Sequence, residues 1–157
     1  MHARFLLLIL AAAAAACGGE SAAPEPDPLD GLRNTVARDS AGNAPPAQSV
    51  AGPGHFRGTV RASEWTGGPD TLANSVRIAG VRVIAYQRRA DGSAGAQAAS
   101  TTTDARGEWQ LPTLPGGEYV VTFTPPESAG FQGVWTIATA HPKSHEWPWW
   151  VTLPRAS

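Results

Sequence analysis

The residue types best suited to metal chemistry gather near the C-terminus, at His141, His145 and Glu146. Neutral imidazole is a common metal ligand, and a spacing of four residues would place both histidines on one face of a helix. Pro142, and a further proline shortly after the segment, instead favour a loop. An open zinc site needs three protein ligands, and only His55 could join the pair from elsewhere in the domain. We therefore expect no metal or other cofactor, and we treat His141 and His145 as candidate partner-binding residues.

A second candidate lies at residues 101–121, TTTDARGEWQLPTLPGGEYVV, which combine an acidic residue with two glycine turns. A calcium loop needs several oxygen ligands, whereas Asp104 has one carboxylate neighbour, Glu108. At the first position of a tight turn, Asp104 can accept hydrogen bonds from backbone N–H groups that follow it, and Gly107 tolerates positive φ. The stretch therefore predicts a structural hairpin turn, after which Trp109 points inward.

The tryptophans are candidates for recognition, since there are six of them in 157 residues and tryptophan is enriched at binding surfaces. Trp149 belongs to the buried face of the predicted last strand. Trp150 points the other way and is expected beside Val134 or Thr136 of the preceding strand, while Trp65 lies in a long loop. An exposed indole could stack on a sugar ring or anchor a protein, so Trp65 and Trp150 are candidate binding residues. The alternative is that Trp150 only covers a sheet face.

The elements that must position these residues are short strands. From His55 onward, runs of aromatic and β-branched residues alternate with polar ones and are separated by Gly, Pro and Asp, a pattern typical of an all-β sandwich or barrel. The period of two predicts one buried and one solvated face on each sheet. The predicted strands are 56–62, 80–88, 97–103, 107–111, 117–124, 132–139 and 147–153, with a surface loop at 63–79.

The N-terminus has the pattern of a secretory signal peptide over residues 1–16. Arg4 precedes the apolar run FLLLILAAAAAA at 5–16, which is too short to cross a bilayer as a helix. Ala14-Ala15-Ala16-Cys17 resembles the bacterial lipobox, in which cleavage leaves a lipid-carrying cysteine as the first residue. Acylation also explains a lone cysteine in a secreted chain. We expect Cys17 to be the lipidation site and the membrane to be contacted through this anchor.

Residues 17–54 predict a disordered linker. They are rich in Ala, Pro and Gly, and from Gly18 onward five acidic residues stand against two arginines. Such a segment buries too little apolar surface to offset its ordering entropy, so we interpret it as a tether that holds the domain away from the membrane. The whole chain has a net charge of −1 without a basic cluster, which argues against nucleic-acid binding. The residues do not indicate an oligomeric state.

Several motifs together carry a family resemblance. Gly58-Thr59-Val60 and Gly80-Val81-Arg82-Val83 are followed by Thr103-Asp104-Ala105-Arg106-Gly107-Glu108-Trp109 and Leu114-Pro115-Gly116-Gly117-Glu118-Tyr119-Val120-Val121. These stretches resemble the carboxypeptidase regulatory-like domains. The resemblance implies a transthyretin-like, seven-stranded Greek-key β-sandwich over residues 55–157, acting as a module without catalytic residues. Tyr119 is placed like the tyrosine corner of sandwich domains, whose hydroxyl bonds a nearby backbone group.

An enzymatic alternative rests on the tail, where Arg155 and Ser157 resemble the C-terminal Arg-x-Ser of hydroxyisourate hydrolases, which share the transthyretin-like fold. Carried over, the likeness would nominate these two residues together with His55, His141 or His145. Pro154 stands where that family has tyrosine. The preferred expectation is a non-catalytic lipoprotein, secreted across the inner membrane and anchored to the cell envelope, most readily at the outer membrane. Its partner would be an envelope protein or a glycan.

Overall fold

The computed structural model describes residues 26–38, 51–62 and 76–157. Strands dominate this part of the chain, which also contains two single-turn 3-10 helices, η1 (Glu127–Ala129) and η2 (Ser144–Glu146). The strands are β1 (Arg33–Asn34), β2 (Arg57–Ala62), β3 (Arg82–Arg88), β4 (Ala94–Thr102), β5 (Glu108–Gln110), β6 (Gly117–Thr124), β7 (Val134–Ala140) and β8 (Trp149–Leu153). The described residues include no helix long and apolar enough to span a membrane.

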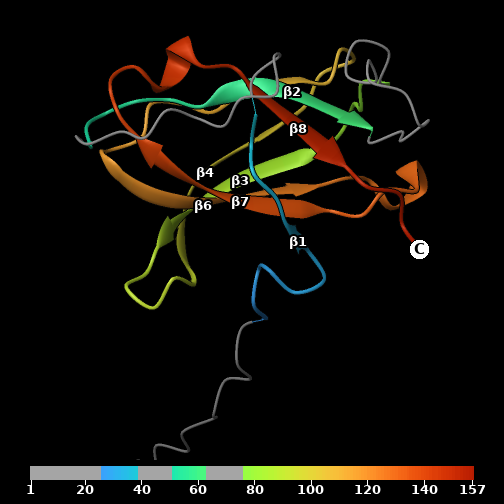
Figure 1. Ribbon diagram of the computed structural model, residues 1–157, viewed down its shortest axis with the longest axis horizontal. Helices are drawn as coiled ribbons and strands as arrows, with labels where there is room; N and C mark the ends of the chain where they lie inside the picture. The colour runs from blue at the N-terminus through green and yellow to red at the C-terminus, as the bar shows by residue number, and fades with distance from the viewer. Residues whose placement is uncertain (1–25, 39–50, 63–75) are drawn as a thin grey trace, which may run out of the picture.

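The described strands form two mixed sheets that lie one above the other (Figure 1). One sheet has the order β1-β7-β6-β3-β4, and the other has the order β5-β2-β8. Each mixes strand directions, since β1 runs parallel to β7 and β2 runs parallel to β8, while the remaining pairs are antiparallel. The prediction of an all-β fold is confirmed, and each predicted strand range overlaps one of the strands β2 to β8.

Aromatic side chains fill the space between the two sheets. The ring of Trp109 on β5 lies 5.3 Å from that of Phe123 on β6 and 5.7 Å from that of Trp149 on β8. Phe56, just before β2, contacts both Trp149 and Tyr119. Four of these rings are at most 4 % exposed, and Phe123 is fully buried. Because each large ring buries about 150–250 Å², this cluster contributes strongly to the packing of the two sheets.

Part of the segment predicted as a disordered linker belongs to the folded domain. In β1, Arg33 and Asn34 pair with Val134 and Trp135 of β7. The chain then crosses to the other sheet, where the backbone of Arg38 exchanges hydrogen bonds of 2.6 and 3.3 Å with Trp150. Between these anchors Ala37 is 2 % exposed and lies in the core. The linker prediction for 17–54 is therefore wrong at residues 33–38, because backbone pairing and one small apolar side chain suffice to dock a polar segment.

The expectation of one solvated face per sheet also needs correction in the five-stranded sheet. Tyr119, Val121 and Phe123 face the core as expected. On the opposite face of the same strand, Val120 is fully buried and Thr122 is 2 % exposed. The middle of this sheet is therefore buried and mostly apolar on its outer face as well as on its inner one.

The first and last strands of the predicted domain pair with each other. In the parallel β2–β8 ladder, Gly58 lies opposite Trp149, and a Cβ on Gly58 would collide with the carbonyl of Trp149. Glycine is therefore required by the close approach of the two backbones. This contact places the outward-facing residues of β2 and β8 on one continuous surface.

Candidate functional site

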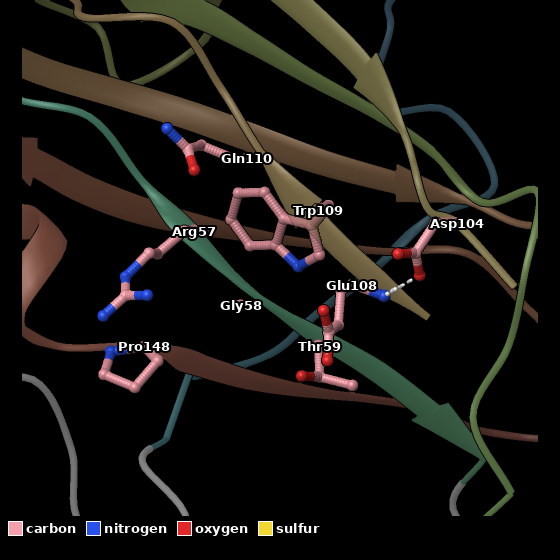
Figure 2. A pocket seen from close by; sticks show the side chains of 8 residues that line it. All are labelled: Arg57, Gly58, Thr59, Asp104, Glu108, Trp109, Gln110 and Pro148. Atoms are coloured by element: carbon pink, nitrogen blue, oxygen red, sulfur yellow. Dashed lines mark hydrogen bonds between the residues drawn. The ribbon is translucent and has the colours of Figure 1, made fainter. Parts of the chain in front are cut away.

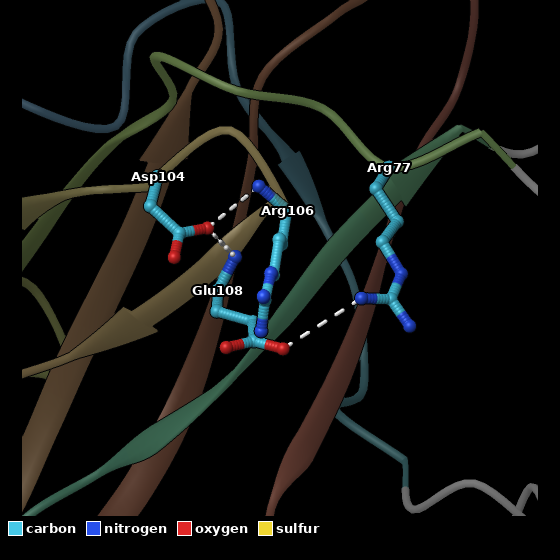
Figure 3. A network of polar contacts seen from close by, with 4 residues as sticks. All are labelled: Arg77, Asp104, Arg106 and Glu108. Atoms are coloured by element: carbon cyan, nitrogen blue, oxygen red, sulfur yellow. Dashed lines mark hydrogen bonds and ion pairs between the residues drawn. The ribbon is translucent and has the colours of Figure 1, made fainter.

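The turn from Asp104 to Glu108 is held together by its own backbone. Oδ1 of Asp104 accepts hydrogen bonds from the backbone N–H of Arg106 at 2.8 Å and of Glu108 at 2.9 Å (Figure 3). Gly107 has φ +70°, the left-handed conformation that the turn requires. The Glu108 carboxylate lies 3.6 Å from the guanidinium of Arg77. The predicted structural role of Asp104 is confirmed, because its carboxylate accepts two backbone hydrogen bonds that close the turn.

Tyr119 also has the predicted structural duty. Its ring is 2 % exposed, and its hydroxyl donates a 2.8 Å hydrogen bond to the carbonyl oxygen of Pro115, four residues upstream. Burial raises the pKa of Tyr119 above its ordinary value, because the charged phenolate would lose hydration. The bond therefore connects the turn at Pro115-Gly116 to the start of β6.

A hollow of about 450 Å³ lies on the outer surface of the three-stranded sheet (Figure 2). Strands β2 and β5 build it, since Arg57 pairs with Gln110 and Thr59 pairs with Glu108 across the antiparallel ladder. Paired residues project to the same face of a sheet, so these four polar side chains share the surface. The complete lining is Arg57, Gly58, Thr59, Asp104, Glu108, Trp109, Gln110 and Pro148.

The hollow presents hydrogen-bond donors and acceptors side by side. Nε of Arg57 donates a 2.7 Å bond to the carbonyl of His145, which orients the guanidinium on the rim. The Glu108 carboxylate is half exposed, and Gln110 and Thr59 add an amide and a hydroxyl. A guanidinium recognises carboxylates and hydroxyl oxygens, and a carboxylate accepts from hydroxyl groups. The surface can therefore bind a polar ligand that carries both kinds of group.

Sequence reasoning identified the outward face of β2 but missed the hollow. The alternation in residues 56–62 places Arg57, Thr59 and Arg61 on the solvent side. No sequence signal showed that Glu108 and Gln110 would lie beside them, because the pairing of β2 with β5 joins segments about fifty residues apart.

The two candidate histidines of the C-terminal segment do not form a shared site with Glu146. The His145 ring stacks on His55 with centroids 5.1 Å apart. Nδ1 of His141 instead accepts a 3.2 Å hydrogen bond from the backbone N–H of Lys143. Among the described residues, no group of three or more His, Cys, Asp or Glu side chains is placed to hold a metal ion. The histidines border the hollow only through the backbone of His145.

Trp150 lies on the outer surface of the three-stranded sheet, as its outward orientation required, but its neighbours differ from those predicted. It pairs with Thr59 of β2, whereas Val134 and Thr136 belong to the other sheet. The guanidinium of Arg61 lies 3.8 Å from the centre of the indole ring, a cation–π contact. Burial, and to a lesser degree the charge of Arg77, lowers the pKa of Arg61. One face of Trp150 is thus already occupied.

The residues nominated by the hydrolase alternative are spread along β8. Arg155 follows the strand, where it pairs with Phe131. His145 and its stacking partner His55 lie at the opposite end, ahead of Trp149. A five-residue strand is about 16 Å long. The arrangement gives the hydrolase alternative no support.

Two predicted site residues, Cys17 and Trp65, lie outside the described residues. No protein-family model matches this sequence, and no significantly similar protein of established function was found.

Proposed function

We propose that this chain is a lipid-anchored protein of the cell envelope whose β-sandwich is a non-catalytic binding module. Signal peptide, lipobox and Cys17 together support secretion and anchoring. The fold that we propose is the transthyretin-like Greek-key sandwich of the carboxypeptidase regulatory-like domains. Strands at each predicted range, the Asp104 turn and the Tyr119 hydroxyl bond all support that assignment.

The observation that carries the binding role is the hollow between β2 and β5. The two carboxylates that line the hollow are not arranged as a catalytic pair, because each has a structural partner. The Asp104 carboxylate accepts hydrogen bonds from its own turn, and the Glu108 carboxylate lies beside the guanidinium of Arg77. A ligand rich in hydroxyl groups and bearing carboxylates suits this combination, which among envelope components describes a glycan. The candidate platform Trp150 would contribute less than the hollow, because Arg61 covers one face of its ring.

Binding can be tested by incubating the purified protein with insoluble envelope glycans and measuring the protein that remains in solution. Arg57→Ala and Glu108→Gln are expected to weaken retention, each by roughly tenfold if a charged hydrogen bond of about 1.5 kcal/mol is lost. Arg89→Ala, in the turn between β3 and β4, is the matched control because it removes an exposed arginine away from the hollow. Equal retention of all four proteins would reject the hollow as the binding site.

The anchor is tested separately by metabolic labelling with a palmitate analogue. The wild-type chain should incorporate label and fractionate with membranes, whereas Cys17→Ser should not be labelled. An unlabelled wild-type protein would contradict the lipoprotein assignment without affecting the glycan experiment.

A further inference from the structure

The outer surface of the five-stranded sheet carries two adjacent rows of mostly apolar side chains. In one row, Ile137 of β7, Val120 of β6 and Tyr86 of β3 lie side by side. In the next row the same three strands contribute Trp135, Thr122 and Ile84. We call these six residues the Trp135 face: Ile84, Tyr86, Val120, Thr122, Trp135 and Ile137.

The Trp135 face is built like a recognition surface, with an apolar centre and a charged margin. Val120, Thr122 and Ile84 are at most 6 % exposed, whereas Ile137 is 39 % exposed and the rings of Tyr86 and Trp135 are half-buried. One end is bordered by the ion pair of Arg88 with Glu118, 2.9 Å apart. These residues are separate from the core between the sheets, which faces the other way.

Because residues 33–38 pair with the two sheets, the proposed tether is shorter than the sequence predicted. The described chain begins at Pro26, so only the eight residues 18–25 separate it from Cys17. At full extension they span no more than about 30 Å. Residues 26–32 project from β1 on the side of the five-stranded sheet that faces away from β2 and β8 (Figure 1). The described chain therefore begins on the same side as the Trp135 face, next to the strand that carries Trp135.

The dimensions of the face favour a lipid surface over a second copy of the chain. Three strands spaced about 4.8 Å apart and two rows about 7 Å apart cover on the order of 200 Å². A stable protein interface needs about 800 Å² from each partner. A bilayer that is already tethered does not need a large area, because a short linker gives an effective concentration in the millimolar range. Trp and Tyr rings beside an aliphatic residue, with Arg88 at the margin, also match the preference of these side chains for the membrane–water interface.

We propose that the Trp135 face docks on the lipid bilayer to which Cys17 is attached, with Trp135, Tyr86 and Ile137 inserted at the level of the headgroups. This inference rests on the proposed lipid anchor for its geometry. Docking would hold the five-stranded sheet against the membrane and turn the hollow of the opposite sheet away from it, toward the ligand.

The test uses the full chain purified from membranes and reconstituted into vesicles of phosphatidylethanolamine and phosphatidylglycerol that contain a brominated phospholipid. Bromine quenches indole fluorescence at contact. We expect quenching in the wild type that is largely absent in Trp135→Phe, a conservative change that keeps an apolar ring. Ile137→Asp should reduce the docked population roughly tenfold, because it replaces an inserted aliphatic group by a charge. Val76→Asp is the matched control, since Val76 is 58 % exposed and lies beside the three-stranded sheet.

Mass spectrometry of the same samples reports whether Cys17 carries lipid, so the two proposals fail separately. A lipidated protein whose quenching is the same in wild type and Trp135→Phe overturns docking and leaves the anchor intact. Quenching through Trp135 without lipid on Cys17 supports docking and rejects the anchor. Loss of quenching as the protein-to-lipid ratio rises, with the effect abolished by Ile137→Asp, would assign the face to a second copy and overturn the proposal.

Discussion

The hydrogen bond from Tyr119 to Pro115 allows a quantitative test of the fold. Tyr119→Phe removes the hydroxyl and keeps the ring among the core aromatics, so the change isolates one hydrogen bond of 2.8 Å. A bond of this kind contributes about 0.5–1.5 kcal/mol to the free energy of unfolding. Pro115 is exposed, so water can reach the carbonyl that loses its donor. We therefore do not expect the larger cost of an unsatisfied buried group. For a domain of about 100 residues, 1 kcal/mol corresponds to a fall in Tm of about 4–8 °C.

The assay is thermal and urea unfolding followed by near-ultraviolet circular dichroism, with Tyr86→Phe as the control. Tyr86 is half-buried on the outer surface of the five-stranded sheet. Removing its hydroxyl should therefore change the free energy of unfolding by no more than about 0.5 kcal/mol. Equal stability of Tyr119→Phe and wild type would refute the structural role of the hydroxyl. An equal loss in both variants would show a general effect of removing phenol groups.

The same residue predicts a dependence on pH. Because burial raises the pKa of Tyr119, the folded state holds the phenolic proton more tightly than the unfolded state does. The associated stability is complete below the unfolded pKa of about 10 and is lost as pH rises through the folded pKa. Wild type should therefore lose stability more steeply than Tyr119→Phe above pH 10, measured by urea unfolding at each pH. Parallel curves for the two proteins would contradict this.

Three further substitutions test the other structural assignments. Ala37→Asp should destabilise the domain by about 3 kcal/mol or more in urea unfolding, because it buries a charge without a partner. Val36→Asp, at a position 53 % exposed, should have little effect, and equal behaviour of the two would place the segment outside the fold. Gly58→Ala should cost at least about 1–3 kcal/mol through its collision with the backbone of Trp149, and a wild-type Tm would refute that contact. Asp104→Ala should cost about 1 kcal/mol in the same assay by removing two backbone hydrogen bonds, and no loss would mean that the turn closes without them.

Local features of the fold were predictable because their causes are local. The turn at Asp104 needs an acceptor at its first position and a left-handed residue at its end, and Asp104 and Gly107 stand three residues apart in the sequence. Tyr119 finds its acceptor four residues upstream. The alternation of apolar and polar residues likewise identified the strands from β2 to β8, since the period of a strand is a property of adjacent residues.

The outcome was different wherever partners come from distant segments. The prediction for Trp150 failed in its neighbours because β8 pairs with β2 and not with β7. The polar composition of residues 33–38 indicated disorder, yet backbone bonds to β7 and Trp150 hold them on the domain. The solvated face expected on β6 is instead buried at Val120 and Thr122, which lie between β3 and β7 in the sheet.

The sequence by itself thus determined the all-β class, the approximate strand ranges and the structural duties of Asp104 and Tyr119. It also contains the motif on which the proposed lipid anchor depends. Only the tertiary structure decided which polar side chains share the hollow, which side of the domain carries the Trp135 face and how little chain is left for the tether. These features depend on strand order and sheet packing, which arise from contacts between segments far apart in the chain. The alternation of residues within one strand does not indicate which strands lie beside it.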